Sequence, residues 1–399
     1  MQLKQLKDAA RSMFGLSNAH NALLCGRVHP VAIFVMGLAL DASLGCNSST
    51  LGPGGIDASS DATDDGAGAR VIASGQAAPA ALSVAGENVY WLNLGTNASM
   101  GKVVAPWTNG QIMKCAITGC EDAPTALVSR LVDGIVDTPT GFATNGTDVY
   151  WNNGTLSPPN APAGLAKCSV SGCPLGSEVA GAGPAWQIAL DGKNVYWTTH
   201  SAEVLTCPLS GCGSSPTALW SAGLAPAASG IAVDASDVYW STANGEVMKC
   251  ALSGRNNTPT VLVGATAALA ATNQIALDDA NVYVVDANPA GQGRVVGCAK
   301  SGCGSNPAEF AIGLNAPTAL VTDGVNVYWI ERGADSVDGQ PVSGAGSIRR
   351  CAVGGCNNSP TTIASGLTAP TAIAADASNV YWAEWGTGAA EGRISSAPK

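Results

Sequence analysis

Every tyrosine of this chain lies in one recurring tripeptide, and this recurrence constrains the fold more than any other feature. The copies are Val89-Tyr90-Trp91, Val149-Tyr150-Trp151, Val195-Tyr196-Trp197, Val238-Tyr239-Trp240, Val282-Tyr283-Val284, Val327-Tyr328-Trp329 and Val380-Tyr381-Trp382. Six of the ten tryptophans belong to the same tripeptide. A chain that places its large aromatic residues in this way is a tandem repeat, and its core is one surface copied seven times.

The spacing of the repeats predicts the architecture. Successive tripeptides are 60, 46, 43, 44, 45 and 53 residues apart, and one repeat with short loops contains four candidate strands at 229–234, 237–241, 246–252 and 259–263. Side chains alternate along a strand, so Tyr239 faces away from Val238 and Trp240, and both faces need apolar cover. Stacking of sheet on sheet provides this cover. We therefore predict an all-β, seven-bladed β-propeller of four-stranded blades.

The two ends of the folded region predict how the ring closes. After the last tripeptide the chain has a third strand around Ile394 but no fourth strand. Residues 70–75 closely match residues 361–366, the predicted fourth strand of blade 6. We therefore expect the N-terminal strand to complete blade 7, which removes an exposed sheet edge.

Acidic and amide residues flank the turn before each tripeptide. An Asp ends the predicted first strand at Asp191, Asp234, Asp278, Asp323 and Asp376, with Asn145 in blade 2 and Ala85 in blade 1. Asn or Asp also precedes the Val of every tripeptide. These side chains hydrogen-bond nearby backbone groups, so we predict a role in the turn rather than in catalysis.

The repeat has a family resemblance at the junction of its first two strands. Residues Ile188-Ala189-Leu190-Asp191, followed by residues 195–199, resemble YWTD-type propeller repeats, and the arrangement is also similar to NHL-type repeats. The resemblance covers roughly residues 70–399. YWTD propellers usually have six blades and an acidic residue after the motif Trp, whereas this chain has seven copies and Ser, Thr, Leu, Asn, Ile or Ala there. The resemblance implies a propeller, and function has to be argued from a site.

The N-terminus predicts export from the cytoplasm. Residues 31–40 are an apolar run after a positively charged segment, as in a signal peptide. Ser43-Leu44-Gly45-Cys46 resembles a bacterial lipobox, which implies lipidation of Cys46; plain cleavage that releases a soluble protein is the alternative. We therefore divide the chain into a signal segment (1–46), a flexible Ser/Gly/Asp-rich tether (47–69) and the propeller (70–399). The protein is expected outside the cytoplasm, at the cell envelope as a lipoprotein or secreted.

Ten of the thirteen cysteines form regular C-x4-C pairs. Zinc sites usually combine C-x2-C units with one another or with His. Five local disulfides formed in an oxidising compartment are the preferred interpretation. In blade 4, Cys250 has Arg255 at the partner position. The five predicted disulfides join Cys115 with Cys120, Cys168 with Cys173, Cys207 with Cys212, Cys298 with Cys303, and Cys351 with Cys356.

The charge of the chain argues against one class of partner. The first 46 residues hold Lys4, Lys7, Arg11 and Arg27 against Asp8 and Asp41, so with a total of -10 the rest of the chain carries about -12. A domain with this much negative charge repels the phosphate backbone of nucleic acids. We therefore do not expect nucleic acid as a partner.

The loop between the second and third strands varies in length around the ring. From the last tripeptide residue to the first cysteine position the separation is 24, 17, 10, 10, 14, 22 and 13 residues in blades 1 to 7. Blades 6, 7, 1 and 2 are consecutive in a closed ring and include the three longest of these loops, so together their loops should form a lip on one face. Loops on a rigid scaffold are where binding residues collect. We call these four loops the lip.

The lip supplies the candidate ligand-binding residues: Trp107, Glu331, Arg332, Asp335, Asp338, Glu384, Trp385 and Glu391. An aromatic ring beside carboxylates suits a protein, peptide or carbohydrate ligand, although the loops could merely pack on each other. We predict a monomeric, non-enzymatic binding or scaffold module without cofactor or metal. The alternative is a hydrolase or lyase with a cation in the central funnel, held by Glu331 and Glu384. His200 has no partners for a catalytic triad nearby.

Overall fold

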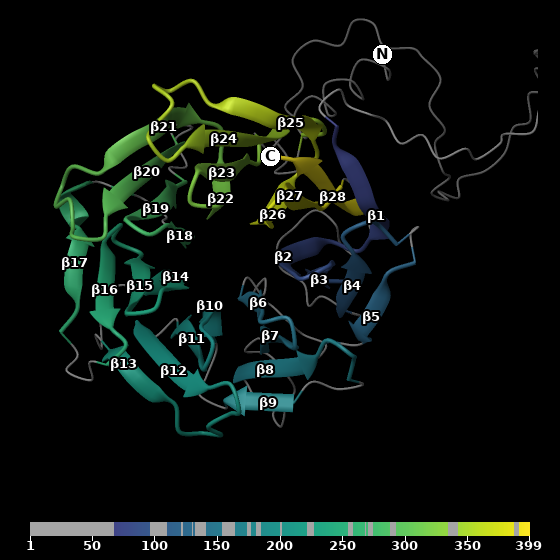
Figure 1. Ribbon diagram of the computed structural model, residues 1–399, viewed down its shortest axis with the longest axis horizontal. Helices are drawn as coiled ribbons and strands as arrows, with labels where there is room; N and C mark the ends of the chain where they lie inside the picture. The colour runs from purple at the N-terminus through teal and green to yellow at the C-terminus, as the bar shows by residue number, and fades with distance from the viewer. Residues whose placement is uncertain are drawn as a thin grey trace, which may run out of the picture. The chain divides into compact units, whose positions relative to one another are not determined.

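The computed structural model describes residues 68–95, 110–120, 123–129, 131, 141–153, 164–173, 177–180, 185–199, 202–221, 227–253, 258–267, 269, 274–287, 293–333, 342–386 and 391–399. These residues form seven four-stranded antiparallel sheets arranged in a ring (Figure 1). The predicted seven-bladed propeller is therefore confirmed. The predicted signal segment, Cys46 and almost all of the predicted tether lie outside the described residues.

The strands of each blade follow one another from the centre of the ring outward. Blade 1 contains β2 (Pro79–Ala85), β3 (Asn88–Asn93), β4 (Gln111–Ala116) and β5 (Thr125–Val128); blade 2 contains β6 (Phe142–Thr144), β7 (Asp148–Asn153), β8 (Gly164–Ser169) and β9 (Ser177–Ala180). Blade 3 contains β10 (Ala185–Leu190), β11 (Asn194–Thr199), β12 (Glu203–Pro208) and β13 (Thr217–Ser221); blade 4 contains β14 (Ala228–Val233), β15 (Asp237–Thr242), β16 (Val247–Ala251) and β17 (Thr260–Val263). Blade 5 contains β18 (Ile275–Leu277), β19 (Asn281–Asp286), β20 (Gly293–Ala299) and β21 (Ala308–Leu314); blade 6 contains β22 (Pro317–Thr322), β23 (Asn326–Glu331), β24 (Gly346–Ala352) and β25 (Thr361–Leu367). Blade 7 contains β26 (Pro370–Ala375), β27 (Asn379–Glu384), β28 (Gly392–Pro398) and, as its outer strand, β1 (Arg70–Gln76).

Among the described residues the core consists of seven apolar clusters, one between each pair of neighbouring blades. Val238 and Trp240 pack toward blade 3 beside Tyr196, whereas Tyr239 packs toward blade 5 beside Val282. This is the alternation predicted from the tripeptide. Each tripeptide therefore contributes to two interfaces, which explains why the whole motif is repeated.

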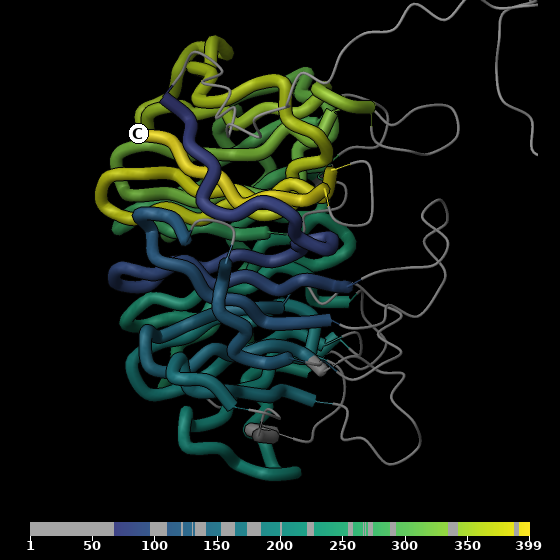
Figure 2. Tube along the Cα trace, turned by 90° about the vertical axis from the view of Figure 1, so that its right-hand side faces the viewer, coloured from purple at the N-terminus to yellow at the C-terminus, as the bar shows by residue number. Residues whose placement is uncertain are grey.

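The N-terminal strand closes the ring. β1 pairs antiparallel with β28, with Arg70 opposite Ser396 and Ala73 opposite Ile394. The two strands lie side by side in both views, with β1 in purple and β28 in yellow (Figures 1 and 2). The predicted strand exchange is confirmed. It joins segments from the two ends of the described chain within one sheet.

All five predicted disulfides form, with Cα–Cα distances of 5.4–5.8 Å. In each pair the first cysteine is buried in the third strand of its blade, and the second is half-buried in the turn that follows. The turn is therefore fastened to the core at one end and reaches the surface at the other. The observed bridges are Cys115 to Cys120, Cys168 to Cys173, Cys207 to Cys212, Cys298 to Cys303, and Cys351 to Cys356.

The disulfide-bonded turns also dock onto the preceding blade. The backbone N–H of Cys120 donates to the carbonyl of Ile72 at 3.4 Å, and that of Cys303 donates to Leu262 at 3.0 Å. Both acceptors lie on the outer strand of the neighbouring blade, blade 7 in the first case and blade 4 in the second. These bridges thus fix turns that hold two blades together.

Reduction of the disulfides should weaken the ring at several interfaces together. Each bridge closes a loop with a sequence separation of 5 residues, so we expect each to contribute about 2 kcal/mol, the low end of the usual range. Thermal unfolding should shift to clearly lower temperature in a reductant. A variant that combines Cys298→Ser with Cys303→Ser should reproduce part of this shift. An unchanged midpoint under verified full reduction would contradict this role.

The acidic residue at the end of the first strand organises the turn, as predicted, and also binds the tripeptide Tyr. In blade 3, Asp191 Oδ1 accepts from the backbone N–H of Lys193 at 2.7 Å and of Asn194 at 2.6 Å. Its Oδ2 accepts from the hydroxyl of Tyr196 at 2.7 Å. The same Asp–Tyr bond recurs in blades 4, 5, 6 and 7. Burial and this bond raise the pKa of Tyr196 to about 12.

In blade 4 the repeated Asp also forms an ion pair with the next blade. Lys300 of blade 5 lies 2.7 Å from Asp234. Burial raises the pKa of Asp234, but the hydrogen bonds from Lys300 and from the backbone N–H groups of Ser236 and Asp237 outweigh burial. They hold the pKa well below its usual value. This bond therefore links two blades through a carboxylate that stays ionised.

Removing the lysine should make the stability of the ring less dependent on acid pH. A carboxyl group whose pKa is lowered by folding stabilises the native state above its unfolded pKa, and this contribution disappears as pH falls through the folded pKa. We expect Lys300→Met to lower the free energy of unfolding at pH 7 by about 1 kcal/mol, the size of a partly exposed ion pair. The difference from the unmodified protein should begin to shrink below the ordinary Asp pKa of about 3.9 and should vanish only at still more acid pH, below the lowered pKa of the folded state. Denaturant titrations across this range test it, and a pH-independent difference would indicate lost packing instead.

Candidate functional site: the lip face and the central channel

The loops of the lip leave from one face of the ring. The first two strands of a blade are antiparallel, so the start of the inner strand and the end of the second strand lie at the same edge, as in Pro317 opposite Glu331 and Pro370 opposite Glu384. We call this edge of the blades the lip face. The loops that make up the lip begin there.

Three successive joints between blades share one construction at the lip face. The carbonyls of Ala78, Ala316 and Ala369 accept from the N–H of Leu94, Arg332 and Trp385 at 3.1, 3.0 and 3.2 Å. Each of these alanines precedes a proline and has a positive φ, of 54°, 50° and 50°. Such a backbone costs about 1–3 kcal/mol for a residue other than glycine, and strain of this kind concentrates at functional sites. The joints lie between blades 5 and 6, 6 and 7, and 7 and 1.

Glycines complete the same three joints. A Cβ on Gly293, Gly346 or Gly392 would lie 2.3–2.6 Å from Cδ of the proline that starts the next blade. No larger side chain fits without moving the backbone, which explains why the third strand of blades 5, 6 and 7 begins with glycine. The roots of the lip loops in blades 1, 6 and 7 are therefore held rigidly.

Glu384 is part of this supporting structure. The sequence analysis placed it among the ligand-binding residues of the lip, but its side chain is buried. Its side chain is 1% exposed. The carboxylate accepts from Arg393 Nε at 2.7 Å and Nη2 at 3.0 Å, from the backbone N–H of Thr368 at 2.8 Å and from Trp382 Nε1 at 3.2 Å. Intramolecular donors occupy both oxygens, so Glu384 supplies an ion pair to blade 7.

Glu331 occupies the equivalent position in blade 6 and is held more loosely. Its Oε2 accepts from the backbone N–H of Asn315 at 3.3 Å, and Oε1 lies 3.8 Å from Arg349 Nε. The following residue, Arg332, is half-buried at the root of its loop. These two side chains lie at the lip face, where the prediction placed them.

Trp385 is half-buried and packs against the cluster between blades 1 and 2. Part of the Trp385 side chain is therefore used in packing between blades. Glu391 is exposed. The other predicted lip residues, Trp107, Asp335 and Asp338, lie outside the described residues, as does His200.

The inner strands of all seven blades line a central cavity with a volume of about 420 Å³, which we call the central channel. Its walls are the inner strands, and its described lining comprises Ala80, Ala81, Leu82, Phe142, Trp186, Gln187, Gly230, Ile231, Gln274, Ile275, Thr318, Thr371, Ala372 and Ile373. Most of these residues belong to the first halves of the inner strands, so this cavity lies toward the lip face. The alternative hypothesis from the sequence placed a cation with the carboxylate ligands Glu331 and Glu384 here, and the described lining contains no ionisable side chain.

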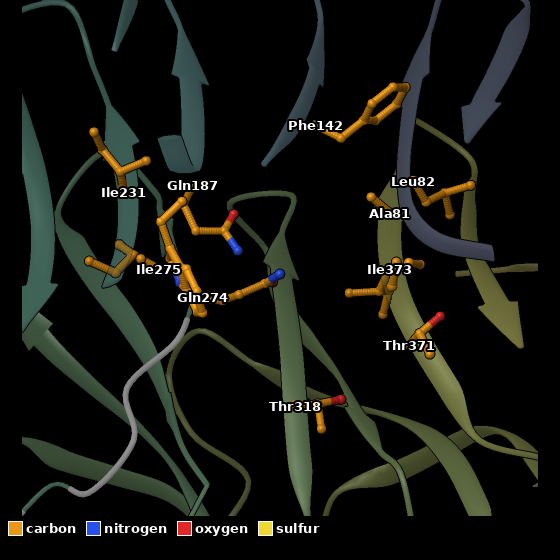
Figure 3. A pocket seen from close by; sticks show the side chains of 14 residues that line it. Ala81, Leu82, Phe142, Gln187, Ile231, Gln274, Ile275, Thr318, Thr371 and Ile373 are labelled. Atoms are coloured by element: carbon orange, nitrogen blue, oxygen red, sulfur yellow. The ribbon is translucent and has the colours of Figure 1, made fainter. Parts of the chain in front are cut away.

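Two glutamines break the pattern of small residues around the channel. In each blade one inner-strand residue pairs with the motif Trp, or with Val284, which replaces it in blade 5. The residue just before that partner is at an equivalent position in all seven blades. In blades 1 to 7 it is Ala81, Gly141, Gln187, Gly230, Gln274, Ala319 and Ala372. Gln187 and Gln274 therefore flank Gly230 of the blade between them. Both amides extend into the opening (Figure 3). Aligning the first strands position by position could have revealed this exception; the tripeptide alone does not.

The described residues contain no group of three or more His, Cys, Asp or Glu side chains that could hold a metal ion. Cys250 carries a buried thiol, and burial followed by the charge of Asp237 raises its pKa. A raised pKa leaves little of the reactive thiolate at neutral pH. The described chain also contains no helix with the length and hydropathy needed to cross a membrane.

Comparisons with known proteins support the fold. No protein-family model matches the chain, and no curated protein matches it. The WD40 repeats of RRP9 are 9% identical over 84% of this chain and 98% of theirs, with a TM-score of 0.56. The WD40 propeller domain of Doa1 is 7% identical over 84% and 98%, with a TM-score of 0.55. A chain of a nidogen/laminin complex is 16% identical over 62% and 88%, with a TM-score of 0.42. The two WD40 likenesses support a β-propeller fold.

Proposed function

We propose that this protein is a non-enzymatic binding module that recognises a protein, peptide or carbohydrate partner through the lip. The observation that carries the proposal is the shared construction of the three joints at the lip face, where strained alanines and tightly packed glycines hold the roots of the loops. A rigid scaffold that presents long, dissimilar loops is the usual arrangement of a recognition surface.

We further propose that the module acts outside the cytoplasm, anchored by a lipid on Cys46. Five disulfides are typical of proteins that fold in an oxidising compartment. The apolar run at residues 31–40 and the lipobox-like sequence ending at Cys46 support this location. Mass spectrometry of the exported protein tests the anchor, because a Cys46→Ser variant should lose the lipid adduct and leave the membrane fraction.

The binding surface is tested by arrays of immobilised peptides and glycans. Trp107→Ala, Arg332→Ala and Asp335→Ala should weaken the signal of bound spots, whereas the matched control Asn244→Ala, in the short loop of blade 4, should not. All variants should keep the unfolding temperature of the unmodified protein. Identical binding by every variant would exclude the lip as the recognition surface. A change in the mass of the immobilised peptide or glycan after incubation would favour the alternative of a hydrolase or lyase.

A further inference from the structure

The channel contains hydrogen-bonding groups that the fold does not use. Gln187 donates its backbone N–H to Thr198 Oγ1 at 3.2 Å, but its side-chain amide forms no hydrogen bond within the described chain. The carbonyl oxygen of Gln274 accepts only from the backbone N–H of Leu320, at a long 3.4 Å, and its NH2 group donates no hydrogen bond within the described chain. Two primary amides thus reach the same cavity with free donors and acceptors.

The rest of the channel wall selects against charged ligands. The described lining is apolar or neutral, and besides the two amides it contains aliphatic residues, the hydroxyl residues Thr318 and Thr371, and the aromatic residues Phe142 and Trp186. A charged ligand would lose hydration here without meeting a counter-ion, which is unfavourable in a partly enclosed site. A wholly apolar ligand would leave the two amides without partners. The chemistry therefore fits a neutral ligand that carries several hydroxyl groups.

We propose that the central channel is a binding site for a neutral carbohydrate of one or two rings, held by the amides of Gln187 and Gln274. Primary amides can donate to one hydroxyl and accept from another, so two of them fix both the position and the orientation of a sugar ring. The cavity of about 420 Å³ lies within the size range of small-molecule sites, about 300–1,000 Å³.

The repeat shows that the two glutamines are not needed by the fold. At the same position five other blades have alanine or glycine. Gly141 is forced by the fold, because a Cβ there would lie 2.6 Å from the carbonyl oxygen of Trp186. Nothing comparable requires an amide in blades 3 and 5. The small residues opposite leave open the space into which the two amides extend.

The site is tested with maltose, cellobiose and N,N′-diacetylchitobiose as probes of the whole protein. Saturation-transfer NMR detects binding, and calorimetry measures the affinity. Gln187→Ala and Gln274→Ala should each weaken binding by about tenfold, the effect of losing one or two hydrogen bonds of about 1.4 kcal/mol in total. The matched control Gln111→Ala removes the same side chain from β4, outside the channel lining, and should not change the affinity.

The outcomes separate this site from the lip. The proposal is supported if a disaccharide binds more tightly than glucuronate and if this binding is weakened by Gln187→Ala and by Gln274→Ala but not by Arg332→Ala. Absence of binding by all three probes overturns it, and so does binding that neither glutamine variant alters. Preference for a neutral peptide over the sugars, lost in the same variants, would also overturn the carbohydrate assignment. Alanine already stands at this position in three blades, so both variants should keep the unmodified unfolding temperature.

Discussion

A protein that begins at Ala77 should not fold into a stable ring, because it lacks β1. Ile72 and Ala73 are 2% and 0% exposed and belong to the cluster between blades 7 and 1. Gln76 accepts from Trp91 Nε1 and Asn93 Nδ2, both at 3.0 Å, so it ties the outer strand of blade 7 to blade 1. Loss of a buried isoleucine costs about 2–5 kcal/mol, and each lost hydrogen bond about 1 kcal/mol.

The removed segment therefore accounts for a free energy similar to the total stability of an ordinary domain, about 5–15 kcal/mol. We expect the truncated protein to unfold without a cooperative transition in calorimetry, or to aggregate through the exposed edge of β28. A truncated protein with a sharp transition near that of the intact chain would show that the ring does not depend on this closure.

A circular permutant gives the matched control. This permutant begins at Ala77 and runs to Lys399. A linker with the sequence of the blade 6 turn, residues 354–360, then joins Lys399 to residues 70–76 at the new C-terminus. The outer strand of blade 7 would then follow its third strand directly, as β25 follows β24 in blade 6. The permutant should recover cooperative unfolding, because it restores every contact of β1 and changes only the connectivity. Failure of both proteins would point to the loss of the Gln76–Ala77 peptide bond itself.

The fold could be predicted because its determinants are local and repeated. Val-Tyr-Trp marks a strand buried on both faces, and the similarity of residues 70–75 to 361–366 identified the closing strand. In blade 4 the predicted strands agree with the observed ones to within one residue at each end. The Asp–Tyr bond was missed, although Asp191 and Tyr196 lie at a fixed separation in the repeat. The pattern located both residues but not the direction of their side chains.

The site could be predicted less well, because it depends on exceptions to the repeat. Sequence alone indicated that Glu384 was a loop carboxylate available to a ligand, but Arg393, nine residues further on, reaches its two oxygens in the sheet. This contact forms because Glu384 and Arg393 are paired across adjacent strands. The loop between them in the sequence gives no sign of this pairing. Gln187 and Gln274 were not selected either. Each is unremarkable within its own blade, and only the ring places them at one cavity.

Replacing Arg393 should destabilise blade 7 more than replacing its acidic partner. Arg393→Met leaves the Glu384 carboxylate, 1% exposed, with only the N–H groups of Thr368 and Trp382 as donors. Removing one partner of a buried ion pair costs about 3–5 kcal/mol, because an uncompensated charge remains away from water. Glu384→Gln instead leaves Arg393, whose side chain is 36% exposed and can be hydrated. We expect that variant to lose about 1–2 kcal/mol.

Denaturant titration measures the stability of the two single variants and of a double variant that combines Glu384→Gln with Arg393→Met. Comparing the three separates the effect of an isolated charge from the effect of lost packing. The double variant should be more stable than Arg393→Met alone, since it removes the isolated charge. Blade 5 supplies an internal control: Asp286 is 1% exposed and lies 2.8 Å from Arg294, at the equivalent strand positions, so Arg294→Met should behave like Arg393→Met. A loss below about 1 kcal/mol in Arg393→Met would mean that water reaches Glu384, and would return this carboxylate to the set of residues through which the lip contacts a ligand.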